Sequence, residues 1–230
     1  MTQHFLPGNP SIPVILRRSS RARRISLRVS RLDGRVSLTL PVGVPEREGL
    51  DFVRQKETWI REQMAQRPDH IRVEEGADVL VEGRLLRVSM GSGRSVRVND
   101  GDLCVPGVPD RAAARVQGFL KQIARERLVA ASDRYAARLG RQYTRITIRD
   151  TRSRWGSCSS AGALMYSWRL VMAPAAVLEY VAAHEAAHLV EMNHSADFWS
   201  LVEDIHGPYR EQRLWLKESG EIFHRYRFGD

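Results

Sequence analysis

Three histidines and one glutamate, all within residues 184–194, are the side chains of this sequence best suited to chemistry. His184 and His188 are four residues apart, and Glu185 directly follows the first of them. Side chains four apart on a helix lie on one face, so both imidazoles can reach one metal ion. Glu185 then lies beside the coordination position left for water. This His-Glu-x-x-His pattern predicts a metal site with its own base.

His194, six residues after His188, is our candidate for a third ligand. A helix continued past His188 would turn residue 194 away from the metal, so we expect the helix to end first. Asn193 is the expected end because asparagine tolerates the left-handed backbone found after helices, and Ser195 can cap a following helix. Glu191 is the alternative ligand, although its place on the same helix suits a group outside the coordination shell better.

The ligand set indicates the reaction. Three neutral nitrogens leave a tetrahedral zinc ion with one open position, and the ion lowers the pKa of water bound there from about 16 towards about 7. Glu185 is therefore the candidate general base, which acts through water and forms no covalent intermediate. We expect one zinc ion per chain, but histidine sites accept other divalent metals too.

Several blocks of the sequence resemble the YgjP-like metal-dependent hydrolases, relatives of the SprT-like and other minimal zincins. The blocks are Tyr180–His188, Asn193–Ser195, Phe198–Trp199, Arg154–Ser159 and Trp168–Leu170. Two positions depart from the family pattern, with Ala186 in place of the usual leucine and Ser167 in place of a frequent asparagine. The resemblance implies a zinc site of His184, His188 and His194, with Glu185 catalytic, in a metallopeptidase-like hydrolase.

The resemblance leaves two substrates open. Peptide-bond hydrolysis is our leading interpretation, and the alternative is hydrolysis of UTP with release of pyrophosphate, the activity assigned to some family members. Arg154 and Arg169 are candidate substrate-binding residues, since a guanidinium can polarise a carbonyl oxygen or hold a phosphate. The motif alone does not choose between peptide and nucleotide.

Arginine accounts for most of the formal net charge of +9, and residues 17–24 are its densest cluster. Guanidinium groups suit phosphate, so weak nucleic-acid contact through this amino-terminal segment is conceivable. Charge runs are more often solvated faces, and the low lysine content suggests a compositional cause. A nucleic-acid-binding protein with a structural metal remains a third hypothesis.

The remaining sequence predicts an α+β fold in two parts. Residues 1–108 read as a β-rich accessory region with one helix, because short alternating segments are separated by glycine-containing turns. Residues 109–230 carry a long helical pattern closed by Gly140, strands at 144–149 and 164–168, and the metal helix. This order resembles a zincin-like catalytic core.

We also expect a cytoplasmic protein without a membrane span. The apolar stretch at 170–190 is interrupted by Glu179, His184 and Glu185, and no apolar signal core follows Met1. The only cysteines, Cys104 and Cys158, are far apart in sequence, which fits a reducing compartment.

Overall fold

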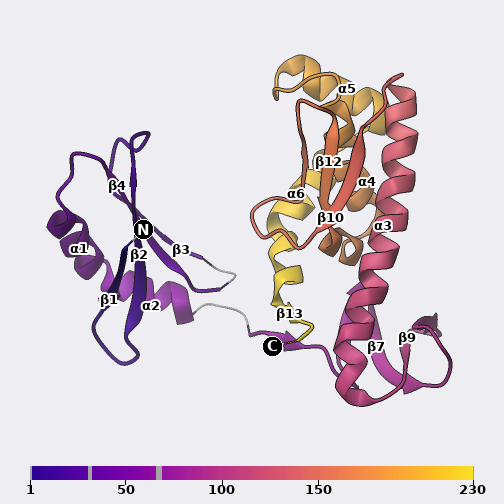
Figure 1. Cartoon of the computed structure of the whole chain (residues 1–230), viewed down its shortest axis with the longest axis horizontal. Helices are drawn as coiled ribbons and strands as arrows, with labels where there is room; N and C mark the ends of the chain where they lie inside the picture. Colours follow the sequence, from indigo (N-terminus) through magenta and orange to yellow (C-terminus); the bar gives the residue numbers. More distant parts are fainter. Residues whose placement is uncertain (1, 31–32, 66–68, 230) are drawn as a thin grey trace. The chain divides into compact units, whose positions relative to one another are not determined.

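The chain divides into two units, residues 1–69 and 70–230, in the computed structural model (Figure 1). The structure describes residues 2–30, 33–65 and 69–229. Its mixture of helices and small sheets confirms the α+β class. The division lies at 69/70 and differs from the sequence-based boundary at 108/109, because the strands between residues 78 and 106 share a hydrophobic core with the helices that follow. Sequence periodicity shows that a segment is a strand, but it does not show which core the strand joins.

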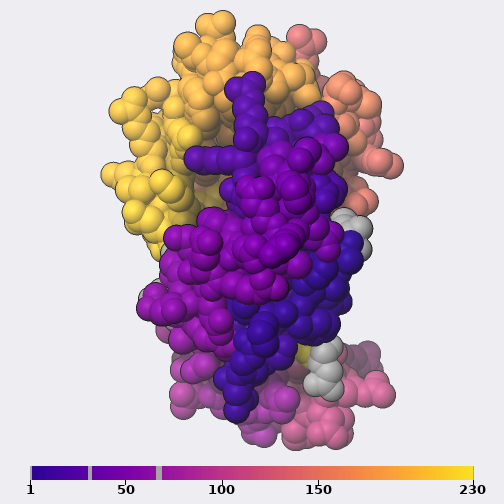
Figure 2. All heavy atoms as spheres, turned by 90° about the vertical axis from the view of Figure 1, so that its left-hand side faces the viewer, coloured from indigo at the N-terminus to yellow at the C-terminus, as the bar shows by residue number. Residues whose placement is uncertain are grey.

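The first unit is a four-stranded sheet with two helices (Figure 1), and Figure 2 shows one face of it in indigo to purple. Its elements are β1 (Thr2–Leu6), β2 (Ile12–Ser19), β3 (Ser26–Val29), β4 (Val36–Pro41), α1 (Glu46–Gln55) and α2 (Glu57–Ala65). The strands lie in the order β1-β2-β4-β3, with β2 parallel to β4 and the other neighbours antiparallel. Leu38, Leu40 and Ile60 are fully buried in a core that belongs to this unit alone.

The second unit holds three small sheets and a group of helices. Its strands are β5 (Ile71–Arg72), β6 (Asp78–Val81), β7 (Arg84–Gly91), β8 (Arg97–Asn99), β9 (Asp102–Pro106), β10 (Arg145–Arg149), β11 (Gly156–Cys158), β12 (Ala163–Ser167) and β13 (Tyr226–Arg227). Its α-helices are α3 (Ala112–Arg138), α4 (Ala175–Ala187), α5 (Ala196–His206) and α6 (Arg210–Ser219). Three 3-10 helices are η1 (Pro109–Arg111), η2 (Trp168–Met172) and η3 (Gly220–Arg225). Among the described residues we find no helix whose length and apolar character would let it cross a membrane.

The long helix α3 is the support for the rest of this unit and runs along one side of it (Figure 1). A stripe of fully buried side chains three or four residues apart follows one face of the helix, as in Val116, Leu120, Ala124 and Leu128. This face packs on β9, η2 and α4. One helix therefore joins the β6-β7-β9-β8 sheet, in which β7 and β9 are parallel, to the elements that carry the histidines.

The sheet beside α4 has the order β10-β12-β11. β10 and β12 are parallel, whereas the short strand β11 pairs antiparallel with β12 through Gly156↔Tyr166 and Cys158↔Leu164. The sequence predicted strands at 144–149 and 164–168, where β10 and β12 lie, and predicted no strand at β11. Three residues are too short to display an alternating pattern.

The segment that enters α4 is held by backbone hydrogen bonds from the turn between β6 and β7. The amide of Glu82 donates to the carbonyl of Val171 at 2.7 Å, and the amide of Gly83 donates to the carbonyl of Met172 at 3.2 Å. Gly83 has a φ of +79°, and a Cβ there would lie 2.9 Å from the Cα of Pro174, the N-cap of α4. The turn therefore needs glycine both for its backbone and for its approach to the helix start.

We expect Gly83→Ala to lower the free energy of unfolding more than Gly101→Ala does. Gly101 also has a positive φ, +88°, but its added Cβ would meet no atom within 4 Å. The extra overlap with Pro174 should make the loss at Gly83 larger by about 1–3 kcal/mol. Denaturant unfolding of the two variants measures the difference, and equal losses would contradict the close approach.

Buried Arg169, which pairs with exposed Asp150, and buried His224 hold the carboxy-terminal segment against η2. Arg169 donates from Nε to Asp150 at 2.7 Å and from Nη1 to the carbonyl of Phe223 at 2.6 Å. His224 stacks on Trp155 with ring centres 5.3 Å apart. Burial, reinforced by the charge of Arg169, lowers the pKa of His224 to about 4. His224 is therefore neutral in the folded protein at pH 7.

We expect His224 to make stability fall as the pH drops from about 6.5, its unfolded pKa, to about 4, its folded pKa. Within this window His224 binds a proton in the unfolded chain but not in the folded chain, so protonation favours unfolding. His224→Gln cannot take up that proton and should show a shallower loss between pH 7 and pH 4.5 in urea unfolding. Parallel pH profiles for the two proteins would contradict this account.

Candidate metal centre

The structure brings His184, His188 and His194 together. Their candidate ligand atoms all lie within 4.8 Å of one another, and the Nε2 atoms of His184 and His194 are 3.1 Å apart. Two nitrogens on one tetrahedral zinc ion are separated by about 3.3 Å, because each Zn–N bond is about 2.0–2.1 Å long. The facing pair thus has the spacing that a single ion requires.

The helix that carries the first two histidines ends at His188, earlier than predicted. His188 is the C-cap of α4, and the amides of Leu189 and Val190 donate to the carbonyls of Ala186 and Ala187 in a tight turn. The prediction that Asn193 ends the helix in a left-handed conformation was wrong, since its φ is not positive. The side chain of Asn193 instead accepts a hydrogen bond from the amide of Ser195 at 2.9 Å. Residues 189–193 therefore form the turn that returns His194 to the site.

Ser195 caps α5 as predicted, because its hydroxyl accepts a hydrogen bond from the amide of Phe198. This cap fixes the start of α5 directly after His194. It also places the fully buried ring of Phe198 among the three imidazoles, with ring centres 4.5 Å from His188, 4.9 Å from His184 and 4.8 Å from His194. Phe198 gives the three rings a shared packing surface, a role that the sequence pattern did not reveal.

The proton positions suit metal binding. Nδ1 of His188 donates to the main-chain carbonyl of Glu191 at 2.8 Å, so that Nε2 is the nitrogen with the free lone pair in the neutral ring. Burial and the neighbouring histidines lower the pKa of His184 to about 3, and burial also lowers the pKa of His194. Neutral imidazole is the form that binds a metal. A cation between the facing nitrogens of His184 and His194 would satisfy both lone pairs, so these residues fit a metal ion.

The alternative ligand Glu191 contacts the cluster through its backbone. Its carboxylate does not belong to the group of ligand atoms that the three histidines form, whereas its carbonyl orients His188. The geometry therefore favours His194 as the third ligand.

Glu185 lies directly under β11. It is 6 % exposed, and a Cβ added at Gly156 would lie only 2.6 Å from its Oε1 atom. Burial raises the pKa of Glu185 to about 8, against a smaller opposite effect of the charge on Arg154. A carboxyl group with a pKa near neutrality is suited to exchange protons at pH 7. Gly156 is a site residue that sequence reasoning missed, although its neighbours in the Arg154–Ser159 block pointed to this segment.

The two candidate substrate arginines differ in position. Arg154 is exposed and close enough to Glu185 for its charge to lower the pKa of that group. Arg169 is 6 % exposed, and Asp150 and the carbonyl of Phe223 occupy its guanidinium. Arg154 is thus available to a substrate, whereas the contacts of Arg169 favour a structural role.

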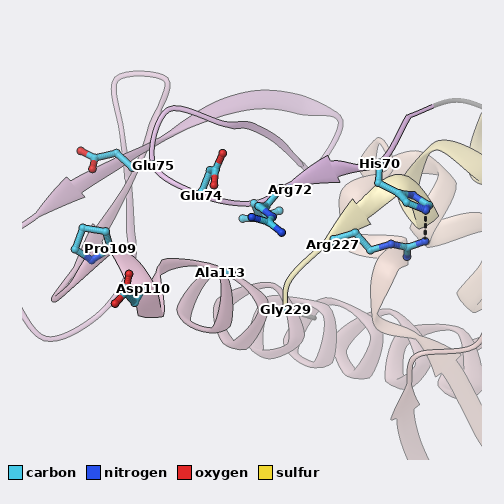
Figure 3. Close-up of a pocket in the computed structure, with 10 residues that line it drawn as sticks. His70, Arg72, Glu74, Glu75, Pro109, Asp110, Ala113, Arg227 and Gly229 are labelled. Carbon is cyan, nitrogen blue, oxygen red and sulfur yellow. Dashed lines mark hydrogen bonds between the residues drawn. The ribbon is translucent and has the colours of Figure 1, made fainter.

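A cavity of about 760 Å³ lies elsewhere in the second unit (Figure 3). Basic and acidic side chains line it together, among them Arg72, Glu74 and Asp110, and Arg227 bonds to His70 at its edge. None of the three clustered histidines lines this cavity, and neither does Glu185. Its mixed charge indicates no particular ligand.

Comparison with known proteins agrees with the geometry. The model of the family described as YgjP-like, metallopeptidase domain matches residues 23–219, which include the histidine cluster, Glu185, Arg154 and Arg169. No curated protein and no solved structure matches the chain. The match covers most of the sequence, so the chain belongs to the YgjP-like family. Membership implies a metal-dependent hydrolase.

We expect His184→Ala, His188→Ala and His194→Ala each to weaken metal binding by more than about 100-fold, because each removes one of three nitrogens. His4→Ala is the matched control, since His4 lies in the first unit. Elemental analysis after dialysis and competition with a chelating dye measure the loss. Unchanged binding in His194→Ala together with loss in Glu191→Ala would replace the third ligand.

Proposed function

We propose that this member of the YgjP-like family hydrolyses peptide bonds, with one zinc ion bound by His184, His188 and His194 and with Glu185 as general base. The observation that carries the proposal is the convergence of three imidazoles beside a buried carboxyl group. His184, His188 and His194 would hold the ion, which would supply an activated water, so the arrangement needs no nucleophilic side chain.

Each residue has a separate task in this mechanism. When bound, zinc supplies Lewis acidity and an activated water. The hydrogen bond from His188 to the carbonyl of Glu191 fixes the ring orientation and the tautomer of that ligand. Glu185 takes a proton from the attacking water and delivers it to the nitrogen of the leaving amine. The exposed guanidinium of Arg154 is the candidate to stabilise negative charge on the substrate oxygen.

The position of β11 favours a peptide substrate. β11 lies at the end of the β10-β12-β11 order, and at Gly156 its backbone closely approaches Glu185. An extended peptide that pairs with such a strand would align its main chain beside the carboxyl group that moves protons. This arrangement suits a chain of peptide bonds better than a compact nucleotide.

UTP hydrolysis remains the alternative activity of the same site, and Arg154 supports it because guanidinium also binds phosphate. The nucleic-acid hypothesis has less support from the arginines at 17–24. Arg18 donates to the carbonyls of Val42 and Val44 at 3.0 and 2.8 Å and so helps to hold the first unit together. A nucleic-acid contact would have to use the other arginines of the cluster.

We expect zinc-loaded protein to cleave members of a mixed peptide pool, and Glu185→Gln to slow this cleavage by at least about 100-fold without loss of zinc. Glu203→Gln, an exposed change on α5, is the matched control and should retain the wild-type rate. Mass spectrometry of the pool measures the products.

UTP is incubated with the same proteins as the peptide pool, and release of pyrophosphate is measured. Pyrophosphate release that depends on Glu185, from a protein that leaves every peptide intact, would replace peptide hydrolysis with the nucleotide activity. No turnover of either substrate, together with nucleic-acid binding that weakens steeply with salt and is unchanged in Glu185→Gln, would favour the structural-metal hypothesis.

A further inference from the structure

Helix α6 carries three basic side chains on the side that faces a second cavity. Arg210, Arg213 and Lys217 follow the spacing of one helix face, and with Tyr209 and Leu214 they line a cavity of about 400 Å³. All three basic residues are exposed. Within the described parts of the chain, no carboxylate forms an ion pair with any of them. The cavity thus has a cationic wall without internal neutralisation.

Arg213, which lines this cavity, is linked to the histidine cluster through the ring of Trp199. The guanidinium carbon of Arg213 lies 4.4 Å from the ring centre of Trp199. The Trp199 ring in turn stacks on His194 with centres 5.7 Å apart, so the guanidinium is at most about 10 Å from the His194 ring. Tyr209 stacks on the same tryptophan, with ring centres 5.1 Å apart. The contact over Trp199 holds the cation of Arg213 in one place.

The guanidinium of Arg213, at most about 10 Å from the His194 ring, acts on a bound metal and on a charged substrate in opposite ways. It repels a metal dication, and within the described residues no carboxylate forms an ion pair with Arg213 that would neutralise its charge. It can instead attract a negatively charged group of the substrate, and the planar fork of arginine suits a carboxylate. An extended peptide advances about 3.3 Å per residue, so 10 Å corresponds to about three residues. The aromatic and aliphatic walls formed by Tyr209 and Leu214 suit the methylene groups of an acidic side chain.

We propose that Arg213, assisted by Arg210 and Lys217, binds an acidic side chain of the peptide within about three residues of the cleaved bond. This inference rests on the proposed peptide-bond hydrolysis and adds its substrate class. The enzyme then prefers aspartate or glutamate over their amides at one position near the cut. The negative charge of the substrate supplies the partner that the three cations lack.

Binding tests the subsite without catalysis. Zinc-loaded Glu185→Gln protein is titrated with acetylated hexaglutamate amide and with hexaglutamine amide, and the change in tryptophan fluorescence gives the affinity. Hexaglutamate places an acid at every position, so the register of binding does not matter. We expect it to bind at least about 10-fold more tightly than hexaglutamine, as a charge-assisted contact predicts.

Arg213→Met is the decisive variant because it keeps a long side chain over Trp199 but removes the charge. Arg125→Met, an exposed change on α3, removes the same charge at a distance. We expect the first to abolish most of the preference for hexaglutamate and the second to retain it. Equal preference in both variants would overturn the inference. If Arg213→Met loses zinc or helical content, Lys217→Met, which leaves Arg213 on Trp199, tests the same subsite and should reduce the preference for hexaglutamate.

Cleavage separates this inference from the proposed function. In a randomised peptide pool, we expect Asp and Glu to be enriched over Asn and Gln at one position near the cut, and Arg213→Glu to shift the preference towards Lys. Cleavage without any acidic preference refutes the subsite but leaves peptide hydrolysis standing. An intact pool refutes the proposed function, and inorganic triphosphate that binds more tightly than hexaglutamate through Arg213 then assigns the subsite to phosphate.

Discussion

The burial of α4 is the constraint on which the rest of the structure depends. This one helix contacts α3, α5, α6, β11 and η2, and Ala182, Ala183, Ala186 and Ala187 on it are fully buried. Small side chains let the neighbouring elements approach closely, so the backbone of α4 has little freedom to shift. His184, Glu185 and His188 inherit that rigidity. A site whose ligands must meet one ion within a few tenths of an ångström needs such a support.

Close packing also explains how polar groups are tolerated in an apolar helix. Glu185 is buried because β11 covers it, and glycine at 156 is the residue type that lets a strand approach so near. His188 satisfies one ring nitrogen with the carbonyl of Glu191, in the turn that ends the helix. The hydrogen bond thus links the end of α4 to the orientation of a candidate ligand. The turn that ends α4 therefore also sets the orientation of the His188 ring.

The sequence predicted the parts of the site that depend on local spacing. The shared face of His184 and His188 and the cap at Ser195 follow from helix geometry and from the chemistry of a serine side chain. The turn after His188 could not be predicted, because it depends on backbone hydrogen bonds that no side-chain pattern indicates. The positions of Arg154 and Arg169 could not be told apart either. Only tertiary contacts show that Asp150 and a carbonyl occupy the second of them.

Individual arginines close to the histidine cluster and Glu185 affect the pKa values of these groups, whatever the net charge of the whole chain. Burial raises the pKa of Glu185 and lowers the pKa of His184 and His194; the charge on Arg154 opposes the first shift, and the charge on Arg213 adds to the other two. The guanidinium of Arg154 therefore favours the carboxylate form of Glu185 against the larger effect of burial, and that of Arg213 favours neutral imidazole, the form that binds a metal. Because both arginines are exposed, they can also meet negative charge on a substrate.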